Sequence, residues 1–140
     1  MISKGDSIYL SKSKNFRSIV LEDVLKILAE KTPITFTTNS KKASKEVGVL
    51  TTDLVAYEFT KKSIEQNKPK LNELAPVYKK IVHPLYLFLD AEFLLYAKLR
   101  KLKHSKITPK KDKISSYIDE LEKKHPEIKR AIVQNYLKFF

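Results

Sequence analysis

The sequence predicts an all-α protein: a four-helix bundle-like core that follows a basic, irregular N-terminal arm and precedes a helical C-terminal extension. Apolar residues recur at spacings of three and four in most of the chain, as they do on one face of a helix. Hydrophobic residues make up 42% of the 140 residues, which is enough for one buried core. The expected parts are the arm at 1–17, the bundle core at 18–104, a basic linker at 105–113 and the extension at 114–140.

The arm, residues 1–17, shows no helical period and mixes cations with aromatic residues. From Ser18 the apolar positions take up helical spacing. Thr32-Pro33 ends this first predicted helix, because proline disfavours helical backbone in the residue before it. Residues 34–38 are too short and too rich in threonine to be more than a connector or an isolated strand.

Two further helices are predicted before residue 85. Asn39 or Ser40 is expected to cap the second helix, whose apolar residues recur at spacings of three, four and seven as far as about Asn67. The third helix is expected to start with Asn72 as its cap and to stop before Pro84, which suits the first position of the next helix.

The fourth predicted helix, residues 85–104, is apolar on nearly every side as far as Ala97, which indicates burial within the bundle. Beyond Ala97 one apolar seam remains, and cations cover the rest of the circumference. Cations at a helix C-terminus gain roughly 0.3 to 1 kcal/mol from the helix dipole. The cations continue past the helix from Lys106 to Lys113, however, which is more charge than the dipole requires. A polyanionic partner would require it, since each neutralised phosphate releases counterions.

The C-terminal extension, residues 114–140, reads as two amphipathic segments split by His125-Pro126. Tyr136, Phe139 and Phe140 belong to the apolar face of the second segment. This face can dock onto the bundle. It can also contact a neighbouring subunit or an envelope lipid, because a basic amphipathic helix with aromatic residues suits a membrane surface.

The residue types present exclude most catalytic chemistry. The absence of cysteine removes disulfides, thiolate chemistry and cysteine zinc sites, and two glycines leave no glycine-rich phosphate loop, so nucleotide-driven catalysis is not expected. Asp90 and Glu92 point about 200° apart on a helix, and we expect them to bond to Tyr86 and Tyr96. No histidine spacing fits a catalytic triad or a metal site. We therefore expect no enzyme, no catalytic residue, no metal and no cofactor.

A formal net charge of +12 predicts an anionic partner. We expect cations from distant parts of the chain to converge on double-stranded DNA with little sequence preference, since phosphate contacts carry no base information. Met1 to Leu10 has no apolar signal segment, and the apolar run from residue 85 is too short to span a bilayer, so a soluble protein is expected. The candidate DNA contacts are Lys4, Lys12, Lys14, Arg17, Lys41, Lys42, Lys45, Lys98, Arg100, Lys101, Lys103 and Lys106.

An alternative hypothesis is a transcriptional regulator with a helix-turn-helix at residues 43–59. With Gly48 in the turn, apolar residues occupy the positions where this motif requires them, and Thr51 or Thr52 would cap the recognition helix. The outward face of that helix is apolar and acidic, however, and such groups do not form the bidentate contacts that read base edges. Sequence-independent binding therefore remains the first hypothesis.

The layout resembles the major coat proteins of filamentous and rod-shaped archaeal viruses, of the lipothrixvirus and rudivirus kind. Chain length, the basic arm, a four-helix core without a catalytic constellation and a C-terminal extension carry the resemblance. It implies a coat subunit that pairs with itself or with a related coat subunit and wraps linear double-stranded DNA inside a helical virion. In enveloped members a lipid layer surrounds the filament, which the C-terminal segment would contact.

Overall fold

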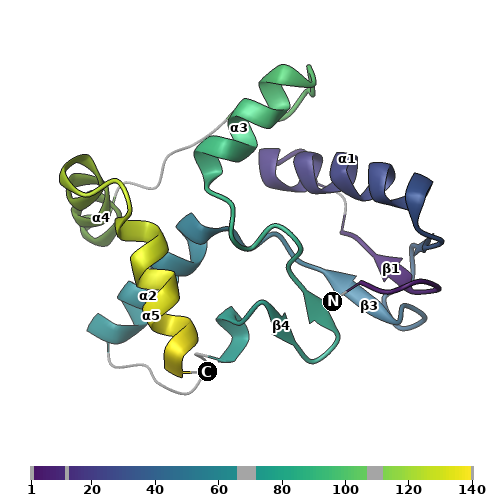
Figure 1. Ribbon diagram of the computed structural model, residues 1–140, viewed down its shortest axis with the longest axis horizontal. Helices are drawn as coiled ribbons and strands as arrows, with labels where there is room; N and C mark the ends of the chain where they lie inside the picture. The colour runs from purple at the N-terminus through teal and green to yellow at the C-terminus, as the bar shows by residue number, and fades with distance from the viewer. Residues whose placement is uncertain (1, 12, 66–71, 107–111, 140) are drawn as a thin grey trace.

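The fold contains a five-stranded mixed sheet, so the all-α prediction is wrong. The structure is a computed structural model that describes residues 2–11, 13–65, 72–106 and 112–139. The strand order is β2-β1-β3-β5-β4, and β4 alone runs antiparallel to its neighbour. The elements are β1 (Ser7–Tyr9), α1 (Phe16–Lys31), β2 (Thr35–Thr37), β3 (Lys45–Val47), α2 (Thr52–Ile64), β4 (Val77–Tyr78), β5 (Ile81–Val82), α3 (Asp90–Leu99), α4 (Lys113–Lys124) and α5 (Ile128–Phe139). Figure 1 shows α2, α4 and α5 gathered at one end of the molecule, with the sheet, α1 and α3 toward the other.

Four of the five described strands escaped prediction because each has only two or three residues, whereas β2 lies within residues 34–38, where a connector or an isolated strand was expected. Alternation of apolar and polar residues becomes recognisable over about four to eight residues. Pairing with distant segments stabilises these strands instead: Ile8 of β1 is in register with both Phe36 and Lys45. Because Ile8 is fully buried, the segment predicted as an irregular arm supplies a strand that is paired on both sides.

One predicted core helix, the third, is absent from the described residues, and the second is shorter than expected. β3 and an extended segment occupy the first part of the second predicted helix, and α2 begins only at Thr52. The hairpin of β4 and β5 occupies residues 77–82, where the third helix was expected. The fourth predicted helix is shorter than expected, since turns precede α3, which begins at Asp90. The helix-turn-helix alternative fails for the same reason, because its first helix is a strand.

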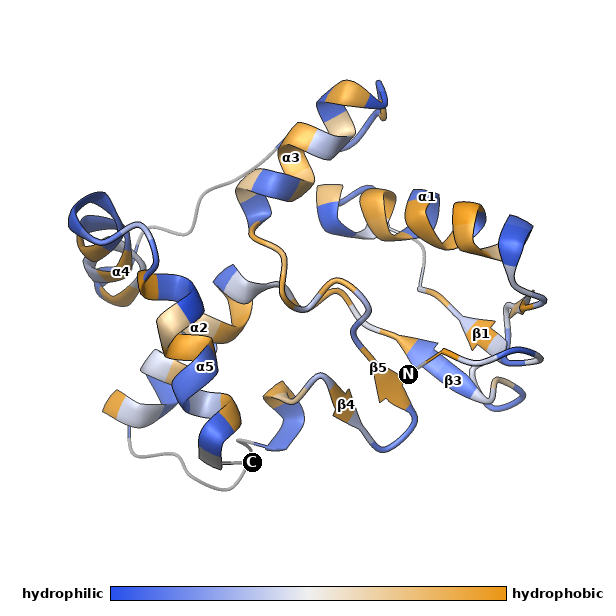
Figure 2. Cartoon of the chain, viewed as in Figure 1, coloured by the Kyte–Doolittle hydropathy of each residue, from blue (hydrophilic) through white to orange (hydrophobic). Residues whose placement is uncertain are grey.

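Three predicted helices are confirmed. The one predicted from Ser18 to the Thr32-Pro33 boundary is α1, and the two C-terminal amphipathic segments are α4 and α5, which are separated at His125-Pro126. The largest apolar cluster joins α1 to the sheet, and Figure 2 shows hydrophobic residues in β1, β5 and much of α1. The buried members of that cluster are Ile8, Leu21, Leu25, Ile34, Val47 and Val82.

A second apolar cluster joins α2 to α5. Val55 and Ala56 from α2 pack with Val133 and Tyr136 from α5, and Tyr136 is fully buried. Tyr136 therefore docks onto this core and is not available for the lipid or subunit contact that the sequence suggested. Phe140 lies outside the described residues, as does the side chain of Phe139. Among the helices described, none has the length and apolar character needed to cross a bilayer.

Gly48 and His83 pack against each other between β3 and β5. Gly48 N–H donates to the Val82 carbonyl at 2.7 Å, and the Leu50 N–H lies 3.4 Å from His83 Nδ1. A Cβ added at Gly48 would lie 2.1 Å from the imidazole ring. The absence of a side chain at residue 48 therefore makes room for a buried histidine.

Stability is expected to fall between pH 7 and pH 5 because of His83. Burial lowers the pKa of His83 below its ordinary value of 6.5, although a hydrogen bond at Gly48 opposes the shift. In that range the unfolded chain binds a proton at His83 that the folded protein excludes. The contribution of neutral His83 to the free energy of unfolding is therefore complete above about pH 6.5 and is lost as pH falls toward the lowered pKa. The slope for one proton is at most about 1.4 kcal/mol per pH unit. Urea unfolding at pH 7.5 and 5.5 should show a smaller difference for His83→Asn than for the wild type; equal differences would contradict this assignment.

Candidate ligand site at the carboxyl ends of the strands

The chain reverses its direction of travel across the sheet next to β1. From β1 it passes through α1 to β2 on one side, whereas β3 lies on the other side of β1. In open α/β sheets, ligands bind in the crevice at the carboxyl ends of strands where the order reverses in this way. Here α1 starts shortly after β1 and α2 starts shortly after β3, so both helices begin at this crevice.

A cavity of about 420 Å³ lies between the starts of α1 and α2, the helices that follow β1 and β3. Its wall includes Arg17 from α1, Asp53 from α2, Asp90 from α3 and Lys129 from α5, together with Lys106 from the segment after α3. With Asp119 from α4, all five described helices thus meet around one space. The aromatic residues Phe16 and Tyr57 also line it.

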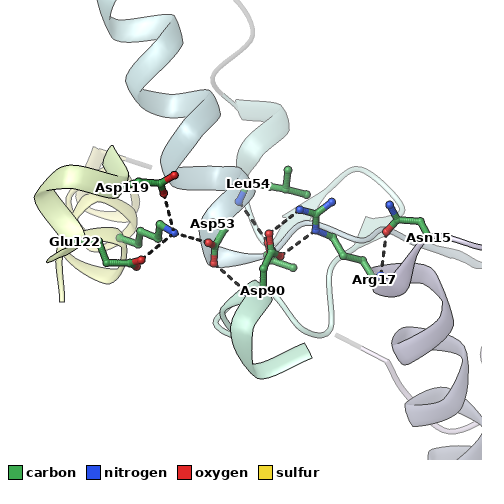
Figure 3. A network of polar contacts seen from close by, with 9 residues as sticks. Asn15, Arg17, Asp53, Leu54, Asp90, Asp119 and Glu122 are labelled. Atoms are coloured by element: carbon green, nitrogen blue, oxygen red, sulfur yellow. Dashed lines mark hydrogen bonds and ion pairs between the residues drawn. The ribbon is translucent and has the colours of Figure 1, made fainter. Parts of the chain in front are cut away.

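Asp90 joins the starts of three helices (Figure 3). Arg17 donates to both of its carboxylate oxygens, with Nε to Oδ1 at 2.9 Å and Nη2 to Oδ2 at 2.6 Å. The hydroxyl of Thr51 donates to Oδ1 at 2.8 Å, while the same hydroxyl accepts from Leu54 N–H and caps α2. The cap of this helix is therefore Thr51, which only the helix-turn-helix alternative named, together with Thr52, and not Asn39 or Ser40. The bidentate pairing fixes the guanidinium in one orientation.

Asp53 links this group to α5. Its Oδ1 accepts the backbone N–H of Asp90 at 2.9 Å, and its Oδ2 accepts from Lys129 Nζ at 2.6 Å. Lys129 also lies 3.3 Å from Glu122 and 3.7 Å from Asp119 of α4. Burial favours the neutral amine, but the hydrogen bond and charge of Asp53 outweigh it and raise the pKa of Lys129. Lys129 is therefore a cation at neutral pH and not a nucleophilic amine.

The cavity is suited to a ligand that has both negative charge and an aromatic ring. The N-terminal ends of α1 and α2 carry partial positive charge, and Lys106 forms no ion pair among the described residues. Phe16 and Tyr57 supply aromatic surface. The described residues contain no group of three His, Cys, Asp or Glu placed to hold a metal ion. No histidine lines the cavity, so its wall holds no Ser-His-Asp triad.

The predicted DNA contacts separate into two groups at opposite edges of the sheet. Lys4 precedes β1, Lys41 and Lys42 precede β3, and Lys45 begins β3, which places them at the amino ends of the strands. The second group lies around the start of α1 and the end of α3: the Ser105 N–H donates to the Lys14 carbonyl at 2.7 Å. This group contains Lys14, Arg17, Lys98, Arg100, Lys101, Lys103 and Lys106. Lys12 lies outside the described residues.

Three of those candidate contacts are neutralised within the protein. Arg17 pairs with Asp90, Lys45 with Asp6 at 3.1 Å, and Arg100 with Asp23 at 3.1 Å. The hydrogen bonds from Arg100 and Tyr96 lower the pKa of Asp23, so Asp23 stays ionised opposite Arg100. These residues therefore serve internal contacts in the free protein.

Sequence reasoning missed Asp53 and Lys129 and gave Asp90 and Glu92 the wrong partners. Tyr86 donates to the Leu74 carbonyl, whereas Glu92 accepts from the Leu89 N–H and from Arg130. A signal for Asp53 and Asp90 was present, because both stand in the first turn of a helix, where carboxylates are favoured. Their convergence depended on the sheet, which the sequence did not reveal.

No protein-family model matches this sequence, and no curated protein matches it. Among solved structures, the U34-tRNA thiolase NcsA from Methanococcus maripaludis, described with its [4Fe-4S] cluster, superposes with a TM-score of 0.73. The sequences are 18% identical, and the match covers 98% of this chain and 73% of that one.

This likeness contradicts the resemblance to viral coat proteins and with it the predicted function. The similar protein is an enzyme with a mixed α/β fold, so the expectations of a DNA-packaging virion subunit and of a non-enzymatic protein are both wrong. The transcriptional regulator finds no support either. At 18% identity the likeness establishes the fold: this chain folds as the tRNA thiolase does, over nearly its whole length.

Proposed function

We propose that this protein is a tRNA-modifying enzyme that holds one nucleotide of its RNA substrate in the cavity between the starts of α1 and α2. The observation that carries the proposal is the position of the cavity. It lies between the starts of α1 and α2, the helices that follow the two strands between which the order reverses, in a fold that matches a tRNA thiolase over 98% of this chain. Because one fold can host many functions, the chemistry of the cavity must support the proposal independently.

The wall of the cavity offers what a nucleotide requires. Lys106 and the N-terminal end of α1 can bind phosphate oxygens. Phe16 and Tyr57 offer ring surfaces, and stacking of a base on an aromatic side chain contributes about 1 to 3 kcal/mol. The Arg17–Asp90 and Lys129–Asp53 pairs hold the surrounding helices in one arrangement.

The iron-sulfur cluster named for the thiolase does not fit this chain. Iron-sulfur clusters are held by cysteine thiolates, and this sequence contains no cysteine. The described residues also provide no alternative group of three ligands. The proposed modification is therefore one that this chain performs without a cluster of its own.

The positive charge supports RNA as the macromolecular partner. A net charge of +12 attracts any polyanion, and the structural likeness favours tRNA over the duplex DNA that the sequence alone suggested. The charge accounts for affinity, whereas the cavity accounts for the selection of a nucleotide.

Crosslinking of tRNA to the protein tests this proposal. A tRNA transcript in which 4-thiouridine replaces some uridines, and which is otherwise unmodified, should crosslink on irradiation. Mass spectrometry should find the attached nucleotide on peptides that contain Phe16, Tyr57 or Lys106. Crosslinks confined to peptides from the amino ends of the strands, such as residues 41–45, would contradict the site. Nucleoside analysis of tRNA from cells lacking the gene should show the loss of one modified nucleoside, restored by the wild-type gene. An unchanged set of nucleosides would contradict the enzymatic role.

A further inference from the structure

Two residues other than glycine have a positive φ in the described chain, and both are lysines. Lys79 and Lys101 each have φ of 55°. Residues with a Cβ are disfavoured in this left-handed region, where glycine is the usual residue. A residue that keeps an unfavourable backbone conformation is a candidate for a functional role of its side chain.

Lys101 stands where a helix most often ends with glycine. The Leu102 N–H donates to the Ala97 carbonyl at 2.9 Å, and the Lys101 N–H donates to the Lys98 carbonyl at 3.2 Å. These two bonds define a Schellman motif, in which the residue in the place of Lys101 adopts left-handed backbone. Leu102 then packs back onto Phe93 and its neighbours. Glycine would meet every backbone requirement of this turn, so the turn itself does not explain the lysine.

Lys101 belongs to a set of exposed cations that we call the α3 ridge: Lys14, Lys98, Lys101, Lys103 and Lys106. The chain that leaves α3 folds back onto the start of α1, because the Ser105 N–H bonds to the Lys14 carbonyl and the His104 ring lies 6.2 Å from the Phe16 ring. Figure 2 shows hydrophilic residues where the chain turns at the far end of α3. Segments that are about ninety residues apart in sequence thus place cations on one surface.

None of the five ridge lysines forms an ion pair within the described part of the chain, whereas many other cations do. These include Arg17, Lys26, Lys45, Lys80, Arg100, Lys129 and Arg130. The helix dipole explains at most the cations in the last turn of α3, since its effect falls off within that turn. Lys14, Lys103 and Lys106 lie outside α3 and need another explanation.

We infer that the α3 ridge binds the phosphate backbone of the RNA and that Lys101 keeps an unfavourable conformation in order to present its charge there. This inference rests on the proposed function and specifies the surface that the RNA follows. Lys106 belongs both to the ridge and to the wall of the cavity. A backbone bound along the ridge is therefore led to the crevice that takes the nucleotide.

Lys101→Gly separates stability from binding, and Lys79→Gly is its matched control. Lys79 has the same φ but lies in the turn between β4 and β5, near the amino ends of β3 and β5. Both substitutions relieve the backbone and should raise the melting temperature by about 3 °C. Lys101→Gly alone should weaken tRNA binding, by about threefold in filter binding at 0.1 M salt. An unchanged melting temperature for Lys101→Gly, or an equal loss of affinity in both variants, would overturn the inference.

Triple variants enlarge the effect at equal net charge. Lys101→Gly with Lys103→Gln and Lys106→Gln should lower tRNA affinity about tenfold or more and make the slope of log affinity against log salt shallower by about 2 to 3. Lys79→Gly with Lys41→Gln and Lys42→Gln removes the same charge from the other edge and should leave both values near those of the wild type. If the two triple variants change tRNA affinity and its salt dependence equally, the inference about the ridge is overturned, but the proposal that the protein binds tRNA is not. If the wild type fails to bind tRNA, the proposed function and the ridge are both refuted. The same holds if the ridge variant loses affinity for anionic lipid vesicles, measured in parallel, but keeps its affinity for tRNA.

Discussion

Replacing Asp90 by alanine is expected to lower the free energy of unfolding by about 2 to 4 kcal/mol. Asp90 accepts two hydrogen bonds from Arg17 and one from Thr51, and its removal leaves a guanidinium without its partner. The Arg17 and Asp90 side chains are each only 20% exposed, so water replaces the lost contacts incompletely. Breaking a fully buried pair costs about 3 to 5 kcal/mol, and the partial exposure reduces that figure.

Asp119→Ala is the matched control for Asp90→Ala. Asp119 lines the same cavity and lies 3.7 Å from Lys129, but its side chain is 61% exposed. Exposed ion pairs contribute little, so its removal should change stability by less than about 0.5 kcal/mol. Urea unfolding should give a lower midpoint for Asp90→Ala with an unchanged m value. Similar midpoints for the two variants would show that Asp90 does not hold the helix starts together.

The parts of the fold that could be predicted are those that are stabilised by contacts within one segment of the sequence. α1 shows its period between Ser18 and Lys31 and ends at a proline, and α4 and α5 show theirs on either side of Pro126. Thr51 could be named as a possible cap, together with Thr52, because a cap bonds within its own first turn, although the main prediction placed the cap at Asn39 or Ser40. In each case the contacts join residues close in sequence.

The sheet and the site could not be predicted because their contacts join distant residues. Ile8 is part of a strand because that strand pairs with the segments of Phe36 and Lys45. The residues next to Ile8 show no alternation of apolar and polar side chains. Arg17 and Asp90 meet across 73 positions of sequence. Nothing local to Asp90 distinguishes it from a carboxylate that stabilises a helix start. The density of cations could be read from the sequence, but its division between the two edges of the sheet required the structure.

Replacing Gly48 by alanine is expected to destabilise the fold by about 1 to 3 kcal/mol, as overpacking of a filled interior does. The new Cβ would lie 2.1 and 2.2 Å from two atoms of the His83 ring, and His83 is only 7% exposed. Either the ring or the segment that leads from β3 to the Thr51 cap must move. Because Thr51 also bonds to Asp90, a shift of that segment would reach the cavity wall.

Gly5→Ala and a double variant distinguish this clash from a general cost of losing glycine. Gly5 has φ of 86° and no atom within 4 Å of an added Cβ, so its substitution costs backbone strain alone. Gly48→Ala should lose part of its effect when His83 is also alanine, since the smaller side chain makes room for the new methyl group. Unfolding free energies of the two single variants and the double variant therefore form a cycle with a coupling of about 0.5 to 3 kcal/mol. Additive effects would mean that Gly48 is required by its backbone and not by the ring of His83.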